Sequence, residues 1–162
     1  MTETLIIRSA SIQQLDLNLP AVKNRFGGSM LSLLTHSHCV KAAEKYPDID
    51  RVYVYKHKSG FRFWQKAAGV TNRSFEATVV QTANASGSGY LNVLLFALTV
   101  RAKKIYICGP ASEITEIKKS TIVLKTIFTV TFKFVSIILT LPAVIMLCII
   151  AIVGGSLLKN KK

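Results

Sequence analysis

The feature that most constrains this chain is an uncharged, largely apolar run of 25 residues, Phe134–Leu158, bounded by Lys133 and Lys159. A helix needs about 20 apolar residues to cross a hydrocarbon core of ~30 Å. A chain of 162 residues offers too little other protein to bury such a helix on every side. The run therefore predicts one transmembrane helix, in which Pro142 is tolerated because membrane helices accommodate proline.

The net charge of +13 is distributed unevenly along the chain. Residues 1–117 hold 14 basic and 8 acidic residues, whereas residues 118–162 hold seven lysines and no acid. A segment that is both apolar and purely cationic points to a membrane and its anionic surface. Half of all residues are apolar, which excludes a disordered protein.

The segment directly before the run is amphipathic when it is drawn as a helix. Over residues 117–133 the apolar side chains take one side, and the opposite side carries the candidate membrane-surface residues Lys118, Lys119, Lys125 and Lys133. This pattern is typical of a helix that lies in the membrane interface. The alternative is a first span that forms a hairpin with the next, which would place Lys125 in mid-membrane.

The N-terminal residues lack the basic and apolar segments of a secretory signal. We therefore expect a single-pass C-terminal anchor with the N-terminal domain on the cytoplasmic side. The expected organisation is a cytosolic domain over 1–112, an interfacial helix over 113–133, a transmembrane helix over 134–158 and a basic tail over 159–162.

Within the N-terminal domain, short β-branched and apolar runs alternate with longer apolar segments. Strands are expected at 4–7, 51–56, 76–81 and 104–108, with 61–66 as a hairpin partner of 51–56. Helices are expected at 29–46 and 90–101. A loop with a short helical turn is expected over 8–20, and a turn over 25–28. The alternation predicts an α/β fold: a small, mostly parallel sheet with flanking helices, similar to the Rossmann fold.

A small-residue loop, Asn84–Gly89, joins an expected strand to an expected helix. Backbone N–H groups at a helix N-terminus bind phosphate, and serine hydroxyls add donors. The loop matches neither G-x-G-x-x-G nor the P-loop pattern. A tight connection that simply needs small residues is the alternative. The candidate phosphate-binding residues in this loop are Ser86, Gly87, Ser88 and Gly89.

Ser88-Gly89-Tyr90, Phe96-Ala97-Leu98 and residues 102–109 are similar to the pattern S-G…A-L…K-x-I-Y-L-x-G. This pattern, together with residues 5–12 and Leu19-Pro20 further on, resembles bacterial family 42 sialyltransferases, in which residues 5–12 would correspond to the opening strand and loop. The resemblance implies that Ser88-Gly89 lies against a CMP-sugar donor, and that Ser9 and Ser11 of the opening loop join it. A nucleotide-sugar donor is the only cofactor implied.

The chain also departs from that family. Arg8-Ser9-Ala10 stands where the family has Gly-Asn-Gly, and no histidine follows His57, although the family's catalytic base is a histidine further downstream. No catalytic residue is therefore assigned; His38 and His57 are the only candidates for a general base. Two functions stay open. One is a membrane-anchored, sialyltransferase-like glycosyltransferase that acts on a glycolipid or polysaccharide acceptor. The other is a non-enzymatic accessory protein with a truncated, inactive transferase-like fold.

Two further clusters of residues have side chains that could bind a ligand. His36, His38 and Cys39 are spaced so that two histidines at i and i+2 point to different faces of a helix, and we expect no metal site. A basic and aromatic cluster could form a two-stranded ribbon, a membrane-facing surface or a site for an anionic ligand; a nucleic-acid site is disfavoured. It comprises Lys56, Lys58, Arg62, Lys66 and Arg73 with Tyr53, Tyr55, Phe61, Phe63 and Trp64.

Overall fold

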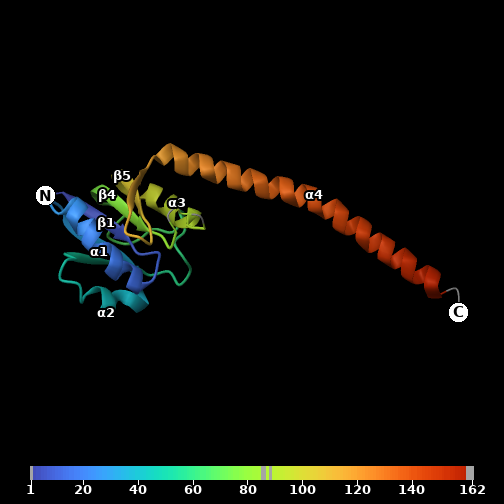
Figure 1. Ribbon diagram of the computed structural model, residues 1–162, viewed down its shortest axis with the longest axis horizontal. Coiled ribbons are helices and arrows are strands. Elements are labelled where there is room, and N and C mark those ends of the chain that lie inside the picture. The colour runs from blue at the N-terminus through green and yellow to red at the C-terminus, as the bar shows by residue number, and fades with distance from the viewer. Residues whose placement is uncertain (1, 85–86, 88, 160–162) are drawn as a thin grey trace. The chain divides into compact units, whose positions relative to one another are not determined.

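The computed structural model describes residues 2–84, 87 and 89–159 (Figure 1). The chain divides into two units, Met1–Val123 and Leu124–Lys162. The strands are β1 (Glu3–Ile7), β2 (Met30–His36), β3 (Arg51–Tyr55), β4 (Ser74–Gln81), β5 (Arg101–Cys108) and β6 (Ile114–Ile117). The helices are α1 (Ile12–Phe26), α2 (Val40–Ala43), α3 (Leu91–Thr99) and α4 (Lys119–Lys159), with a short 3₁₀ turn at Ser37–Cys39.

The strands form one six-stranded sheet in the order β3-β2-β1-β4-β5-β6. The first five strands are parallel, and β6 runs antiparallel to β5. The central strand β1 is paired on both sides, with Ile7 opposite Leu34 of β2 and opposite Val80 of β4. The expected α/β class with a mostly parallel sheet is confirmed.

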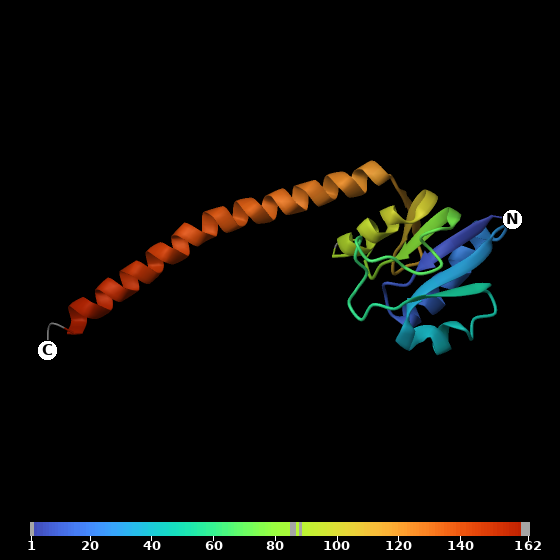
Figure 2. The ribbon, with the colours of Figure 1, turned by 180° about the vertical axis from the view of Figure 1, so that it is seen from behind.

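Helices cover both faces of the sheet. The helix α1 lies in front of the sheet in Figure 1, and α3 lies in front of it in Figure 2, which is turned by 180°. Accordingly there are two cores: one packs Leu15, Leu19 and Val22 of α1 against the sheet, and the other packs Leu94 and Phe96 of α3 on the opposite face. Parallel sheets need such cover because both of their faces are apolar.

Residues 8–20 were expected to form a loop with a short helical turn, and this prediction is wrong because the 15-residue helix α1 occupies most of the segment. Ser11 caps the helix, since its Oγ accepts a hydrogen bond from the N–H of Gln14 at 3.2 Å. Pro20 lies inside the helix, where it removes one backbone hydrogen bond at a cost of about 3 kcal/mol. Burial of the α1 side chains that face the sheet offsets this cost.

A helix over 29–46 was also expected, but the segment starts with strand β2, and only Val40–Ala43 is α-helical. The strand residues Leu31, Leu33 and Leu34 are buried on both faces of the sheet, as are Ser32 and Thr35. A strand buried on both faces shows a continuous apolar run instead of alternation, so its sequence cannot be told from that of a buried helix.

The other expected elements are confirmed with small changes of boundary: 4–7 lies in β1, 51–56 corresponds to β3, 76–81 lies in β4, 90–101 contains α3 and 104–108 lies in β5. Of the expected turn over 25–28, Gly27 and Gly28 form a turn, whereas Arg25 and Phe26 are the last residues of α1. The prediction of a hairpin strand over 61–66 is wrong. Residues 56–73 form an irregular connection whose Phe61, Ala67 and Val70 are buried under the α3 face.

Residues 114–117 were expected to begin the interfacial helix, but they form β6, and the helix begins at Lys119. The first turn of α4 belongs to the first unit, because Ile122 is fully buried in its core and Lys119 Nζ donates to the carbonyl of Ala102 at 2.6 Å. The compact unit therefore extends to Val123, beyond the expected boundary at 112.

The helix α4 continues without a turn from Lys119 to Lys159. The hairpin alternative requires a reversal within this segment and is therefore wrong. By length and composition, α4 is able to cross a membrane over Lys119–Pro142. The expected span over 134–158 overlaps this stretch at residues 134–142.

The buried position of Ile122 yields a stability prediction for a truncated chain of residues 1–123. Replacing Ile122 by Ala should lower the free energy of unfolding by about 2–5 kcal/mol, because the change leaves a cavity in the core. Val123→Ala is the matched control: Val123 is 45% exposed, so its loss should change stability by no more than about 0.5 kcal/mol. Urea unfolding measures both, and equal effects would contradict the packing of this turn.

Candidate functional site

The carboxyl ends of β1 and β4 mark the point where the chain direction diverges. After β1 the chain enters α1 on one face of the sheet, and after β4 it enters α3 on the other. In open α/β sheets, ligands bind in the crevice at such a point, outside the carboxyl ends of the strands. Ser9 and Ser11 follow β1, and Asn84–Gly89 follows β4, so the predicted site residues come from segments at this edge.

Arg8 is the first residue after β1 and is buried, with 8% of its surface exposed. Its Nε donates to Thr35 Oγ1 at 2.8 Å, and one terminal nitrogen donates to the carbonyl of Ala10 at 2.9 Å. The other terminal nitrogen lies 3.0 Å from Cys39 Sγ, which is a weak acceptor. The guanidinium is thereby fixed between the carboxyl ends of β1 and β2.

In the described part of the chain, none of the ion pairs includes Arg8. The nearby carboxylate of Asp16 accepts a hydrogen bond from the Tyr46 hydroxyl. Burial and this carboxylate raise the pKa of Tyr46 to about 12, so Tyr46 stays neutral. A buried cation without a carboxylate partner is costly and attracts an anion.

The residues after Arg8 connect β1, β4 and the start of α1. The Ser9 hydroxyl donates to the backbone carbonyl of Gln81, the last residue of β4. Ser11 is exposed and caps α1, whose N-terminus carries a partial positive charge. Arg8 and the α1 N-terminus together form an electropositive corner of the kind that binds phosphate.

Gln81 lies beside Arg8 in the sheet, because each follows directly after the paired residues Ile7 and Val80. Its side chain is completely buried, and within the described structure neither its amide oxygen nor its amide nitrogen has a hydrogen-bond partner. Buried amide groups are almost always paired, so each exception calls for a physical reason. A polar ligand at this edge would satisfy both atoms.

The loop after β4 is held at its base by Thr82, whose hydroxyl donates to the carbonyl of Asn84 at 2.6 Å. Gly87 and Gly89 have φ values of +66° and +82°, a conformation that favours glycine. Gly87 is buried against Leu94 and Ile107, whereas Gly89 borders open space. Ser86 and Ser88, the other predicted loop residues, lie outside the described residues.

A second set of polar side chains lies next to the carboxyl ends of β4 and β5. Asn18 of α1 is fully buried, and its Oδ1 accepts hydrogen bonds from Gln14 and Ser112. Its amide nitrogen is unpaired in the described structure, as is the buried Oε2 of Glu113. Burial and the Glu113 carboxylate raise the pKa of the Cys108 thiol to about 11, which makes Cys108 a poor nucleophile.

The three histidines lie at the carboxyl ends of β2 and β3. The His36 ring packs edge-on against Tyr55 and Phe61, and its centroid is 5.8 Å from that of His38. Burial lowers the pKa of His36, and the charge of Arg8 lowers it further, against a raising contribution from the Ser59 carbonyl. His38 is exposed, and His57 packs against Tyr55. Among the described residues, no cluster of three or more His, Cys, Asp or Glu side chains is placed to hold a metal ion.

Sequence reasoning missed Arg8 and Gln81 as site residues. Arg8 directly follows β1, and Gln81 is the last residue of β4. A polar residue at the end of an apolar strand was a signal for the carboxyl edge of the sheet, although the sequence alone does not show that the two residues lie side by side. The basic and aromatic cluster does not form one surface: Tyr53, Tyr55 and Phe61 are buried in the core, and Arg73 lies 3.6 Å from Glu3.

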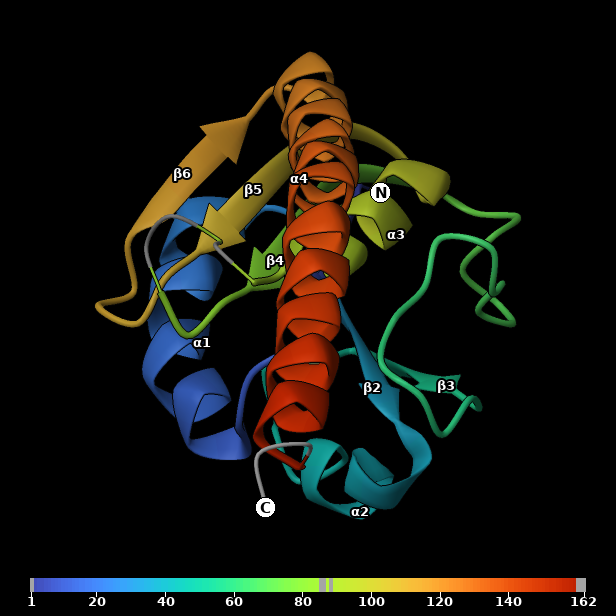
Figure 3. The same cartoon turned by 90° about the vertical axis from the view of Figure 1, so that its right-hand side faces the viewer.

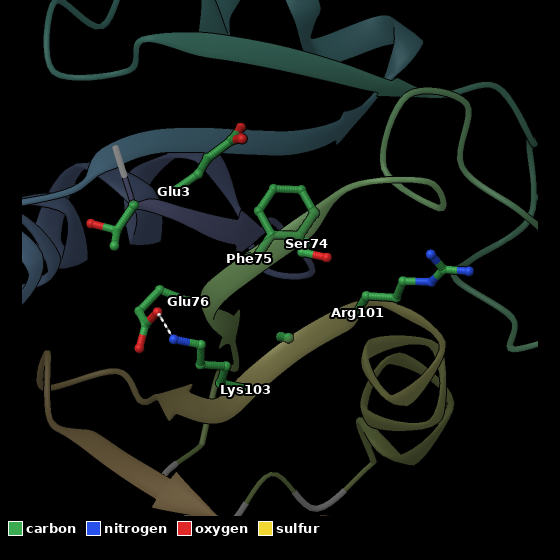
Figure 4. Close-up of a pocket in the computed structure, with 8 residues that line it drawn as sticks. Glu3, Ser74, Phe75, Glu76, Arg101 and Lys103 are labelled. Carbon is green, nitrogen blue, oxygen red and sulfur yellow. Dashed lines mark ion pairs between the residues drawn. The ribbon is translucent and has the colours of Figure 1, made fainter.

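A hollow of about 470 Å³ lies at the opposite edge, between the amino ends of β1, β4 and β5 (Figure 4). Glu76 and Lys103 pair across it at 2.7 Å, and Glu3 lies within ion-pair distance of Arg51 and Arg73. None of the predicted site residues lines this hollow. Its pairing of opposite charges makes it a weaker binding candidate than the carboxyl edge.

Comparison of the chain with protein-family models, with curated proteins and with solved structures found no match.

The environment of His36 predicts a pH dependence of stability. Because its pKa is lower in the folded state than in the unfolded chain, the unfolded state binds the proton first as the pH falls below about 6.5. Stability should therefore fall between pH 7 and pH 5, and His36→Phe, which keeps the aromatic packing, should reduce that fall. Urea midpoints across this range, measured on both proteins, test this; parallel curves would contradict it.

Proposed function

We propose that the chain is a membrane-anchored, glycosyltransferase-like protein whose α/β domain binds a nucleotide sugar at the carboxyl ends of β1 and β4. The resemblance to family 42 sialyltransferases favours a CMP-sugar donor, with a glycolipid or surface-polysaccharide acceptor. The single observation that carries the phosphate-binding part is buried Arg8, which has no carboxylate partner in the described structure and lies one short loop before the N-terminus of α1.

Arg8 and Gln81 would bind two different parts of one nucleotide sugar. Arg8 and the α1 N-terminus would neutralise phosphate. Gln81 carries both a donor and an acceptor without partners in the described structure, which suits the polar edge of a base or sugar. The loop at Gly89 borders open space and would let a ligand approach the backbone closely.

The anchor belongs to the same proposal. The helix α4 would cross the membrane once over residues 134–158, with the domain on the cytoplasmic side, and its exposed Lys125 and Lys133, which precede that span, would lie near lipid headgroups. A membrane-bound domain meets a glycolipid acceptor in two dimensions, which raises the effective concentration of that acceptor.

Membrane fractionation tests the anchor. The full chain should stay with membranes after alkaline carbonate extraction, because high pH removes proteins held by electrostatic contacts but does not remove an inserted helix. Protease added to sealed inside-out vesicles should digest the domain, and right-side-out vesicles should protect it. Release of the protein by carbonate would contradict the span, and digestion in right-side-out vesicles would contradict the orientation.

A thermal-unfolding series on the full chain in detergent tests ligand binding. CMP, UMP and inorganic phosphate are the probes. A nucleotide at 100 times its dissociation constant should stabilise the fold by about 2.7 kcal/mol, which is several degrees in the melting temperature. No shift with any nucleotide, in a protein shown to be folded, would contradict the proposal.

Two matched variants connect that shift to the site. Gln81→Leu removes a buried amide that is unpaired in the described structure, so it should leave stability unchanged or raise it, yet abolish most of the nucleotide shift. Thr78→Val removes a buried unpaired hydroxyl three residues earlier on the same strand and should keep the shift. If both variants bind nucleotide equally well, Gln81 does not contact the ligand.

The accessory-protein alternative is favoured by the positions of the histidines. All three precede β4 in the chain, and the candidate bases His38 and His57 come from the β2 and β3 side of the sheet. Incubation with a CMP-sugar donor and an acceptor glycan separates the two functions. Release of CMP that His38→Ala or His57→Ala abolishes would support the transferase, whereas nucleotide binding without release would support the accessory protein.

A further inference from the structure

The connection between β3 and β4 is drawn in green in Figure 3. It carries two aromatic side chains that are exposed to solvent. Phe63 is 52% exposed and Trp64 is 61% exposed, and their rings meet edge to face with centroids 4.8 Å apart. Large exposed aromatics that lie next to each other mark interaction surfaces in soluble domains. We call Phe63 and Trp64 the aromatic tip.

The aromatic tip is held in place from both sides. Before it, Phe61 is buried against Tyr55 and Phe96. After it, Gln65 Oε1 accepts a hydrogen bond from the Tyr55 hydroxyl at 2.6 Å, and the Gln65 N–H donates to the Arg62 carbonyl at 3.0 Å. The loop is therefore anchored to the core while Phe63 and Trp64 point outward, so their exposure is built into the fold.

The chain segment that carries the tip is purely cationic. Residues 51–75 contain six Lys and Arg and no Asp or Glu. Arg51 and Arg73 form ion pairs with Glu3, at N···O distances of 3.8 and 3.6 Å. The other four have no ion pair in the part of the chain that the structure describes, and all are exposed: Lys56, Lys58, Arg62 and Lys66.

We infer that the aromatic tip and these four cations form a docking surface for an anionic lipid bilayer, through which the α/β domain rests on a membrane. Tryptophan and phenylalanine settle at the level of the lipid headgroups, where one end of the ring is apolar and the other is wet. Lysine and arginine stems lie along the apolar surface while their charges reach lipid phosphates.

Two observations favour a bilayer over other occupants. The guanidinium of Arg62 lies over the Trp64 ring at 5.3 Å, which leaves at most one face of that ring for stacking on a nucleic-acid base. The same chain also carries α4, which is apolar enough to cross a membrane. The inference is independent of nucleotide binding, because the tip and the Arg8 site come from different segments.

The chain offers a built-in probe, since Trp64 is its only tryptophan. The full chain is reconstituted into vesicles of phosphatidylcholine alone, or of phosphatidylcholine mixed with phosphatidylserine. In the mixed vesicles, Trp64 emission should move to shorter wavelength, and lipids brominated near the headgroup should quench it. Both effects should weaken at high salt, because salt screens exposed charges.

Charge-reversal variants test the electrostatic part. Lys58→Glu with Lys66→Glu should abolish the shift and the quenching; in the described structure the ring contacts of Trp64 are with Arg62 and Phe63, which this variant keeps. The matched control is Lys41→Glu with Lys45→Glu, which makes the same change of charge at exposed positions around α2 and should leave both signals intact. Phe63→Ser should reduce the quenching while the charges remain. Far-ultraviolet circular dichroism checks that each variant is folded.

Four outcomes would overturn the inference. One is solvent-like Trp64 emission without bromine quenching in the mixed vesicles. Another is equal loss of signal in the two charge-reversal variants. A third is a shift that grows with the amount of protein per vesicle and is not quenched by bromine, which would identify a second copy of the chain as the occupant. The last is quenching of Trp64 by a single-stranded oligonucleotide in detergent without lipid, which would point to nucleic acid.

Discussion

The central strand β1 is hydrogen-bonded to β2 on one side and to β4 on the other, and Leu5, Ile6 and Ile7 are completely buried between the two helical layers. A strand enclosed in this way has only its ends open to other groups. The chain leaves the carboxyl end toward one face, while the chain that leaves β4 turns to the other. The register of these three strands therefore decides which side chains meet at the candidate site. Ile7, Leu34 and Val80 lie side by side in the sheet, and the residues that directly follow them are Arg8, Thr35 and Gln81.

How much could be predicted depended on how far local pattern agreed with packing. The β-branched runs of β3 and β4, and the apolar helix α3, were found because their composition and their burial point the same way. The strand β2 was taken for a helix because burial on both faces removes the alternation that identifies a strand. The helix α1 was missed because residues 8–20 were taken for a polar loop with a short helical turn that ends at Pro20, although the apolar residues Ile12, Leu15, Leu19 and Val22 continue through that position with helical spacing.

The candidate site was predicted in part for the same reason. Ser9, Ser11 and the loop after β4 were recognisable from local sequence, and the fold takes them to one edge of the sheet. Arg8 and Gln81 acquire meaning only from strand register, which joins residues 73 positions apart. Glu113 likewise depends on the reversal into β6, a strand whose residues 114–117 had been assigned to the membrane-proximal helix.

The unpaired polar groups explain why this edge, more than any other part of the described structure, is suited to a ligand. Four described residues have buried polar atoms without a partner, and three of them, Asn18, Gln81 and Glu113, lie beside the ends of β4 and β5 or on the part of α1 that faces them. Each such atom destabilises the free protein by about 1–3 kcal/mol, and an apolar replacement of similar shape would remove that cost. A fold of ordinary stability, about 5–15 kcal/mol, retains few such groups. These atoms lie along the edge of the sheet that also holds buried Arg8. The amide nitrogens of Asn18 and Gln81 can donate to the oxygens of an anion, whereas Glu113 Oε2 needs a donor, so the pattern is the one expected when the compensating partner is a polar molecule that carries both kinds of group.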